Sequence, residues 1–267
     1  MLFRSTRIAA GLLAAAVLRL RRGAGAMRVT RSQLRASAIV GVLLLFGGNG
    51  FVAVAEQVLP SGLAALLVST TPLWLVVLGL LVGERARRAS VAGTVIGFAG
   101  TAVLANPLNV PGSSGGRGAW WGTPLILVAT ACWAGGSLYS RHQASPADPF
   151  VASAYQMLVG GATLVVVGVA TGEAGGFDVA SVPAAGWWAL AYLVVVGSLV
   201  AYTAYFWLLG NAPLQLVSTY AYVNPVVAVA LGWALLGEHV TLPVLVGGGL
   251  AVAGVVVVIS SERSAAS

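Results

Sequence analysis

Residues 60–72 read PSGLAALLVSTTP, and residues 213–225 read PLQLVSTYAYVNP. Each stretch begins and ends with a proline, and both prolines recur after 153 residues. The tripeptide VST also occurs in both stretches. We interpret its two copies as equivalent positions of the repeat, in the same register as the prolines. A repeat this long in an apolar chain is too long for a solenoid unit. It predicts two fused helical half-bundles, a construction common in secondary transporters.

The composition is that of an integral membrane protein. Hydrophobic residues make up 58% of the 267 residues, charged residues only 8%, and the mean hydropathy is +0.93. Soluble domains are about a quarter charged. A single cysteine, Cys132, excludes an intrachain disulfide, and the two histidines cannot form an imidazole metal cluster. We therefore expect no cofactor or metal, and as partners the lipid bilayer and a small-molecule substrate rather than nucleic acid.

Apolar stretches of membrane-spanning length predict an all-α fold, a polytopic transmembrane helix bundle. The eight full segments lie near 36–55, 61–82, 89–105, 119–140, 149–170, 184–208, 214–236 and 241–260. A ninth stretch, 7–18, is shorter and is followed by the basic run RLRRG rather than by a small-residue cleavage site. It predicts a real but incomplete span.

The arginines indicate the orientation of the chain in the membrane. Eleven fall in alternate loops and the C-terminal tail, whereas only Arg117 falls in a loop on the opposite side. Positive charges concentrate on the cytoplasmic side. The pattern predicts a multi-pass protein of the plasma (cytoplasmic) membrane with a cytoplasmic C-terminus. The eleven are Arg19, Arg21, Arg22, Arg28, Arg31, Arg35, Arg85, Arg87, Arg88, Arg141 and Arg263.

The repeat also divides the chain. We expect a first repeat at 1–105, a flexible linker at 106–118, a second repeat at 119–260 and a cytoplasmic tail at 261–267. Shifting the first helix of the second repeat back by 153 residues places it before Met1. The first repeat is thus expected to lack its first helix. About nine helices are present, where two inverted sets of five would make ten.

Several stretches resemble one transporter family. They are NGFVAVAEQVLPSGLAALLVSTTPLWLVVL at 49–78, GERARRASVAGTVIGFAGTAVL at 83–104, and STYAYVNPVVAVALGWALLGEHVTLPVLVGGGLAVAGVVVV at 218–258. Together they resemble the EamA-type permeases of the drug/metabolite transporter superfamily. RIAAGLLAAAVLRLRRG at 7–23 resembles the second helix of that family, and the first helix is absent. The resemblance implies ten helices in two inverted repeats and export of amino acids, metabolites or amphipathic compounds.

Pro72 and Pro225 lie inside apolar segments, where a proline removes one backbone hydrogen bond and leaves a carbonyl free. A tolerated packing kink explains a single membrane proline. Because the two occupy equivalent positions in the two repeats, we predict paired hinges.

Glu56 and Gln57 end one apolar segment, and Asn49 lies seven residues before Glu56 on the same predicted helix face. A carboxylate within a bilayer is costly and often belongs to a substrate pathway or proton relay. A solvated helix end is the competing interpretation. We predict that these three residues line a polar cavity.

Other polar and aromatic side chains lie within the apolar segments. Spacing places Tyr202 and Tyr205 on one helix face, and Tyr220 and Asn224 on another. Core packing is the default for each, and lining of a polar cavity is the functional alternative. The predicted substrate-contacting residues of this kind are Trp74, Trp133, Gln156, Tyr202, Tyr205, Tyr220 and Asn224.

Small residues recur at four-residue spacing at Gly93, Gly97 and Thr101, and again at Gly247 and Ala251. Such stripes let helices approach closely in lipid. They predict packing inside the bundle, with a homodimer through these helices as the alternative.

Three function classes are compatible with a helical membrane protein. A carrier explains the repeat, the charge pattern, the paired prolines and the sparse polar groups. An intramembrane enzyme acting on a lipid-like substrate lacks support, because the sequence contains no HExxH, no GxSxG and no close aspartate pair. A channel lacks a repeated pore-lining signature. The sequence predicts a secondary transporter working by alternating access, with a membrane enzyme or a non-transporting truncated product as alternatives.

Overall fold

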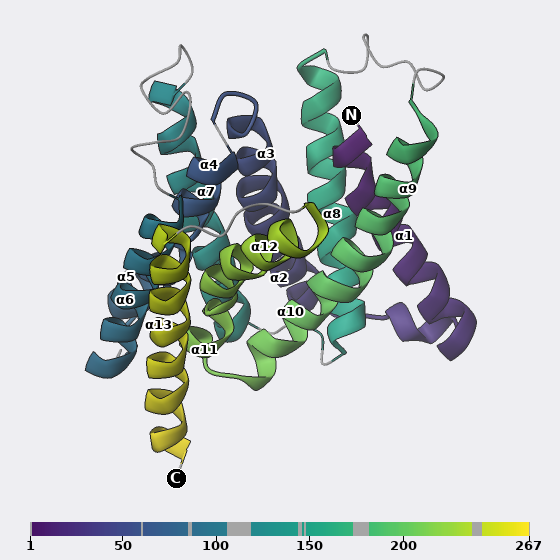
Figure 1. Ribbon diagram of the computed structural model, residues 1–267. Helices are drawn as coiled ribbons and strands as arrows, with labels where there is room; N and C mark the ends of the chain where they lie inside the picture. Colours follow the sequence, from purple (N-terminus) through teal and green to yellow (C-terminus); the bar gives the residue numbers. More distant parts are fainter. Residues whose placement is uncertain are drawn as a thin grey trace. The chain divides into compact units, whose positions relative to one another are not determined.

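The computed structural model describes residues 2–59, 61–84, 87–105, 119–143, 146, 148–172, 182–236 and 242–266 (Figure 1). Within these ranges the chain forms nine helical segments separated by turns, and no strand. The predicted all-helical fold is confirmed. The predicted linker at 106–118 lies outside the described residues.

Several segments are divided by a change of helix type or by a turn. In chain order the helices are α1 (Leu2–Arg22), η1 (Ala24–Met27), α2 (Arg31–Gly41), η2 (Val42–Gly50), α3 (Phe51–Ala55), α4 (Ser61–Val68), α5 (Thr71–Leu81), α6 (Arg88–Ala105), α7 (Ala119–His142), α8 (Pro149–Ala170), α9 (Ala184–Tyr192), η4 (Leu193–Val200), α10 (Ala201–Asn211), α11 (Leu214–Ser218), α12 (Tyr220–Leu236) and α13 (Leu242–Ala266).

Two ends differ from the prediction. The N-terminal helix α1 has 21 residues rather than the 12 predicted, because it starts at Leu2 and continues through the basic residues to Arg22. Its length of about 31 Å matches the hydrocarbon core of a bilayer. At the other end, α13 continues to Ala266, so the residues predicted as a tail extend the last helix.

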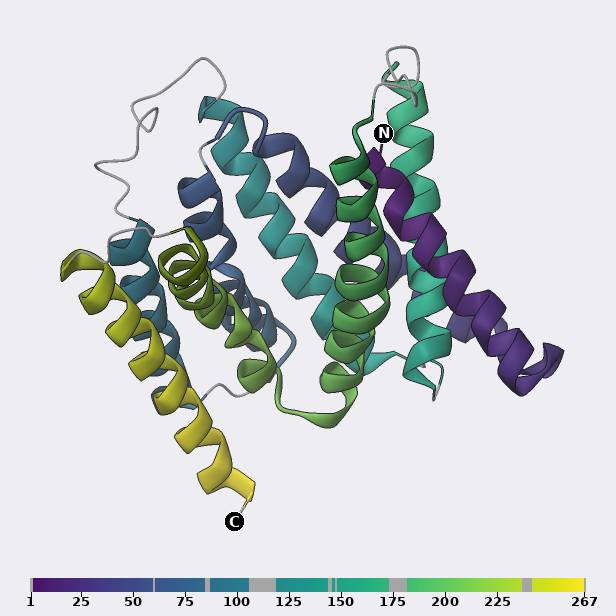
Figure 2. The ribbon, with the colours of Figure 1, turned by 45° about the vertical axis from the view of Figure 1, so that its right-hand side comes forward.

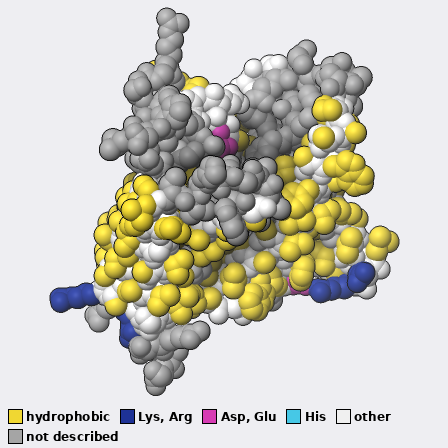
Figure 3. Space-filling view, viewed as in Figure 1, with side chains coloured by type: hydrophobic (Ala, Val, Ile, Leu, Met, Phe, Trp, Pro, Cys, Tyr) yellow, Lys and Arg dark blue, Asp and Glu magenta, His cyan; other side chains and the backbone are white. Residues whose placement is uncertain are grey.

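Within the part of the chain that the structure describes, five helical stretches are long and apolar enough to cross a membrane. They are Arg31–Ala55, Leu63–Leu81, Pro149–Ala170, Ala184–Asn211 and Leu242–Ser261. Large hydrophobic side chains cover much of the surface seen in Figure 3, and several of them are more than half exposed. Leu242 and Val256 of α13 are 73% and 57% exposed, a surface that lipid would cover.

The chain forms two compact units, and each unit combines parts of both sequence repeats (Figure 2). Unit 1 contains Met1–Gly50 and Tyr139–Asn211, and unit 2 contains Phe51–Leu138 and Ala212–Ser267. The predicted halves are therefore repeats of sequence rather than separate compact bodies. The reason is that helices of one repeat pack against helices of the other within each unit.

In unit 1, α1 is attached to α8 at the end where α8 begins. Asp148 caps α8, because its Oδ1 accepts a hydrogen bond from the Phe150 amide at 2.8 Å, and its other oxygen pairs with Arg22 at the end of α1. The Tyr155 hydroxyl of α8 donates to the Met27 carbonyl at 2.7 Å. Buried Leu18 packs with Val151 in the same place.

Two long helices of unit 1 contain a π-helical segment, η2 after α2 and η4 after α9. Their first residues, Val42 and Leu193, are separated by nearly the repeat spacing. In η4 the Ser198 hydroxyl donates to the Leu193 carbonyl, five residues earlier, at 2.9 Å. π-Helical turns are rare and frequently occur at functional sites. The sequence analysis did not predict them.

In unit 2, the helix containing Pro72 is broken just before the proline. α4 ends at Val68 and α5 begins at Thr71, with Pro72 in its first turn. The missing amide of Pro72 would leave the Val68 carbonyl free, but the Thr71 hydroxyl donates to that carbonyl at 2.7 Å. The hydroxyls of Ser69 and Thr70 donate to the preceding turn in the same way.

The second repeat breaks at its own VST, between α11 and α12, where Ser218 and Thr219 donate to carbonyls three residues earlier. Our interpretation that VST shares the register of the prolines was wrong. Val68 and Val217 are 149 residues apart, four fewer than the prolines. The break follows the hydroxyl residues, and Pro225 therefore lies inside α12 rather than at its start.

The small residues predicted to pack helices do so in unit 2. α6 and α13 lie side by side (Figure 1), so close that a Cβ placed on Gly100 would lie 2.3 Å from the Ala251 nitrogen. A Cβ on Gly254 would lie 2.4 Å from the Gly97 nitrogen. The hydroxyls of Ser90 and Ser261 are 2.6 Å apart near one end of the pair. The stripes thus bring two backbones into contact within the bundle.

Candidate functional site

Arg7 is a positively charged residue inside helix α1, surrounded by apolar sequence. Its Nη1 donates to the Ser198 hydroxyl at 2.8 Å and to the Gly197 carbonyl at 3.3 Å. Both acceptors belong to η4. Arg7 has no acidic partner among the described residues. The ion pair that these residues form joins Arg22 and Asp148. The guanidinium is therefore held only by neutral groups.

One helical turn beyond Ser198, Tyr202 continues the polar contacts toward α8. Its hydroxyl donates to Oε1 of Gln156 at 2.7 Å, and both side chains are buried, with Tyr202 4% and Gln156 0% exposed. Arg7, Gln156, Ser198 and Tyr202 form a set that we call the polar cluster. It joins α1, α8, η4 and α10 of unit 1.

Among the described residues of unit 1, four buried polar atoms lack a hydrogen-bond partner: Arg7 Nε, Gln156 Nε2, Ser153 Oγ and Ser37 Oγ. Ser153 lies one turn before Gln156 on α8. Ser37 lies one turn before Gly41 of α2, where a Cβ would be 2.4 Å from the Gln156 carbonyl oxygen. Ser37, Ser153 and Gln156 therefore lie where α2 packs against α8. Buried polar groups are nearly always hydrogen-bonded, so this concentration needs an explanation.

The polar cluster lies near the middle of helices that can cross a membrane. Ser198 is central in the stretch Ala184–Asn211, and the backbone at Arg7 touches Gly161, central in Pro149–Ala170. A Cβ on Gly161 would lie 3.1 Å from the Arg7 carbonyl carbon. An arginine at that depth costs about 3 kcal/mol on insertion scales. Such residues are usually retained for a function.

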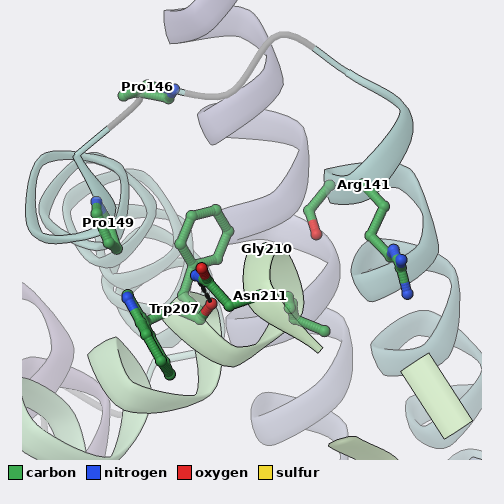
Figure 4. A pocket seen from close by; sticks show the side chains of 9 residues that line it. Arg141, Pro146, Pro149, Trp207, Gly210 and Asn211 are labelled. Carbon is green, nitrogen blue, oxygen red and sulfur yellow. Dashed lines mark hydrogen bonds between the residues drawn. The ribbon is translucent and has the colours of Figure 1, made fainter. Parts of the chain in front are cut away.

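A pocket of about 460 Å³ opens near the far end of α10, also in unit 1 (Figure 4). Phe206 contributes to its wall and lies one helical turn beyond Tyr202. Asn211 Nδ2 donates to the Trp207 carbonyl at 2.8 Å beside the pocket. The pocket and the polar cluster are thus linked by one face of α10. The lining residues are Ser140, Arg141, Pro146, Pro149, Phe206, Trp207, Leu209, Gly210 and Asn211.

Of the predicted site residues, unit 1 contains Asn49, Gln156, Tyr202 and Tyr205. The structure joins Gln156 directly to Tyr202. Tyr205 is half-buried and lies three residues after Tyr202 on α10. Asn49 is half-buried within η2. The i, i+7 face predicted for Asn49 and Glu56 assumed a regular α-helix, whereas a π-helix contains Asn49 and α3 ends before Glu56.

The other predicted residues belong to unit 2. Glu56 and Gln57 are exposed in the turn after α3. Trp74, Trp133 and Tyr220 are half-buried, on α5, α7 and α12. Asn224, one turn after Tyr220, is exposed. Pro72 is buried and Pro225 half-buried. Whether these residues meet a substrate or act as hinges stays a prediction.

Sequence reasoning missed Arg7 and Ser198. The predicted N-terminal span of 7–18 begins at Arg7, so this residue falls at its end rather than inside a helix. A serine in an apolar run carried no signal by itself. The signal that could have identified Arg7 is a charged residue inside an apolar helix. Recognising it requires that the helix be extended to Leu2, where α1 begins.

The family model described as "EamA-like transporter family" matches residues 2–106 and 120–260. This chain belongs to that family. The resemblance seen in the sequence is thereby confirmed, and the two matches divide the chain as its internal repeat does.

Curated relatives of this EamA-like protein are named as transporters. "Uncharacterized inner membrane transporter YedA" of Escherichia coli strain K12 is 39% identical over 233 residues, which cover 86% of this chain and 72% of that protein. "Uncharacterized transporter YoaV" of Bacillus subtilis is 24% identical, covering 86% and 77%. A solved structure described as "Crystal structure of protein" covers all of this chain and 89% of its own, with a TM-score of 0.80 and 23% identity. That structure supports the fold.

Proposed function

We propose that the protein is a secondary transporter that exports small metabolites, amino acids or amphipathic compounds by alternating access. The observation that carries this proposal is the polar cluster in a member of a transporter family, because its residues Gln156, Ser198 and Tyr202 are buried in helices long and apolar enough to cross a membrane. Sparse polar groups at mid-membrane are where carriers bind substrates.

The pocket beside α10 is a candidate entrance for an exported substrate. It is lined by residues around the α7–α8 loop and the end of α10, which the arginine pattern predicts to face the cytoplasm. A substrate entering there would reach Phe206 first and Tyr202 one turn deeper. The broken helix at Ser69–Thr70 and the kink-forming Pro225 supply positions where a helix can bend during the transport cycle.

The export proposal predicts a change in metabolite distribution. Cells overproducing the protein should show several-fold more of a few small metabolites in the medium and less inside, compared with deletion cells. Gln156→Leu at equal membrane abundance should abolish the difference, because it removes the partner of Tyr202. Untargeted mass spectrometry of cells and medium measures this. An unchanged metabolite profile in all three strains would contradict the proposal.

The arginine pattern predicts which end of each helix faces the cytoplasm. The proposed direction of export depends on this orientation. In a Cys132→Ala background, Thr171→Cys at the end of α8 should react with a membrane-impermeant maleimide added to intact cells. Ala89→Cys near the start of α6 should react only after the cells are opened. Both positions are exposed. The opposite labelling would reverse the orientation and contradict uptake from the cytoplasm.

A further inference from the structure

We propose that the start of helix α2, where Arg28, Arg31 and Arg35 lie, binds the phosphodiester headgroup of an acidic phospholipid. This surface contains none of the residues of the polar cluster or the pocket, and lipid binding there does not depend on the transport function. The site is indicated by the position of the arginines along the helix, by the unfavourable charge at that helix end, and by the fixed backbone around them.

The start of α2 lies at the edge of a membrane-crossing stretch. That stretch, Arg31–Ala55, contains 25 residues. Its helical length is about 37 Å, whereas the hydrocarbon core of a bilayer is about 30 Å thick. One end therefore extends into the headgroup layer, and the charged end at Arg31 and Arg35 is the one that gains from it. Both side chains are exposed, and Leu34 beside them is 41% exposed.

The arginines of α2 lie at the helix end where positive charge is unfavourable. The partial positive charge of a helix N-terminus favours acidic residues in the first turn, and α2 has none there. Instead Arg31 is its first residue, and Arg35 follows four residues later, so the two like charges repel each other along one helix face. Both placements destabilise the helix, and a bound anion would reverse both effects.

The chain does not balance these charges in the part that the structure describes. Arg28, Arg31 and Arg35 have no acidic partner there, since the ion pair near this loop joins Arg22 to Asp148. Arg28 is also exposed, three residues before Arg31. An anion from outside the chain is therefore the partner that these guanidinium groups would take.

The backbone before α2 is held in place on α8. The Tyr155 hydroxyl of α8 donates to the Met27 carbonyl at 2.7 Å, and the Met27 side chain is buried. A capping box between Thr30 and Gln33, with distances of 2.9 and 3.2 Å, then fixes the first turn of α2. The arginines thus project from an ordered backbone, which reduces the entropy lost when a ligand binds.

An acidic phospholipid matches both the charge and the apolar part of this surface. Its phosphodiester carries one negative charge and accepts hydrogen bonds from guanidinium groups. Its acyl chains would lie beside exposed Leu34 and beside Leu20 of α1, which is 86% exposed. A free phosphate would gain the charge interaction alone. In a zwitterionic lipid, the cation of the headgroup already balances the phosphodiester.

The test measures lipid binding to the purified full-length chain in an uncharged detergent. Dioleoylphosphatidylglycerol, dioleoylphosphatidylcholine, glycerol 1-phosphate and inorganic phosphate are titrated separately. Native mass spectrometry and thermal unfolding report binding. Phosphatidylglycerol should bind to the wild type and raise its unfolding temperature. The other three compounds should have much smaller effects at the same concentration.

Two double variants with equal loss of charge locate the site. Arg31→Gln with Arg35→Gln should bind phosphatidylglycerol about tenfold to thirtyfold more weakly than wild type. Arg19→Gln with Arg21→Gln is the matched control, because it removes two exposed arginines from the last turn of α1, where positive charge is favourable. The control should lose much less affinity.

Reversing one charge gives a readout that a structural role would not produce. Without lipid, Arg31→Glu should raise the unfolding temperature, since it places a negative charge at the start of α2 and four residues before Arg35. With phosphatidylglycerol, the same variant should be stabilised less than the wild type. A lower unfolding temperature without lipid would show that Arg31 supports the fold and would contradict the proposal.

Other results would also overturn the site. Equal weakening in the two double variants would reduce the effect to general positive charge. Equal stabilisation by phosphatidylcholine, or by either soluble phosphate, would exclude an acidic lipid as the specific ligand. Unchanged phosphatidylglycerol binding after the loss of Arg31 and Arg35 would remove these arginines from the site. If that double variant does not fold, Arg31→Glu and the single variant Arg35→Gln test the same contacts.

Discussion

Gly254→Leu is expected to prevent stable folding of the α6–α13 pair. A Cβ on Gly254 would lie 2.4 Å from the Gly97 nitrogen and 2.6 Å from the Gly93 carbonyl oxygen. These neighbours are backbone atoms of α6, which cannot turn aside as a side chain can. Overpacking a core costs about 1–3 kcal/mol where side chains adjust, and we expect more here. The variant should yield little monodisperse protein in detergent.

Gly249→Leu is the control for this prediction. Gly249 lies on the same helix, but nothing lies within 4 Å of a Cβ placed there. Its effect on yield and thermal unfolding should be small. Gly254→Ala should fall between the two, since alanine adds the clashing Cβ alone. Equal yields for Gly254→Leu and Gly249→Leu would show that the close contact between α6 and α13 does not exist.

Gly160→Leu is expected to abolish transport by displacing α2 from α8 in unit 1. A Cβ on Gly160 would lie 2.4 Å from the Gly41 carbonyl oxygen, and Gly41 in turn touches the Gln156 backbone. Separating these helices moves Gln156 away from Tyr202 and disrupts the polar cluster. Exchange in proteoliposomes should fall to background, with a lower unfolding temperature in detergent.

Val166→Leu tests whether Gly160→Leu acts through the helix contact. Val166 lies on the same helix α8, but it is 66% exposed, so a larger side chain there meets no neighbouring helix. We expect transport and thermal stability close to wild type. If Val166→Leu were as damaging as Gly160→Leu, general sensitivity of α8, rather than its contact with α2, would be the cause.

Gln156 and Tyr202 illustrate how far prediction reached within the candidate site. Both were selected because a polar group inside an apolar segment needs a partner. The structure makes each the partner of the other. Spacing along one helix could not reveal this pairing, because the two residues lie on different helices and are 46 positions apart. The periodicity of a sequence shows which residues share a face of one helix. It does not show which other helix packs against that face.

Arg7 shows the opposite case, in which the residue was visible but its position was misjudged. Its partner Ser198 is 191 positions away and lies in a π-helical turn that no local pattern predicted. α1 packs against α8, far along the chain. Propensity alone does not determine where a helix ends, so the depth of Arg7 could not be inferred from the sequence.

The sequence by itself determined the all-helical membrane fold, the twofold repeat and the family. These are consequences of local chemistry, since a backbone in lipid must satisfy its own hydrogen bonds and does so in helices of bilayer length. The tertiary structure alone decided that each compact unit combines both repeats, that the helix breaks follow Ser and Thr hydroxyls, and that Arg7 meets Ser198. The physical reason is that these features arise from contacts between helices distant in the chain, where close packing rather than local composition selects the partners.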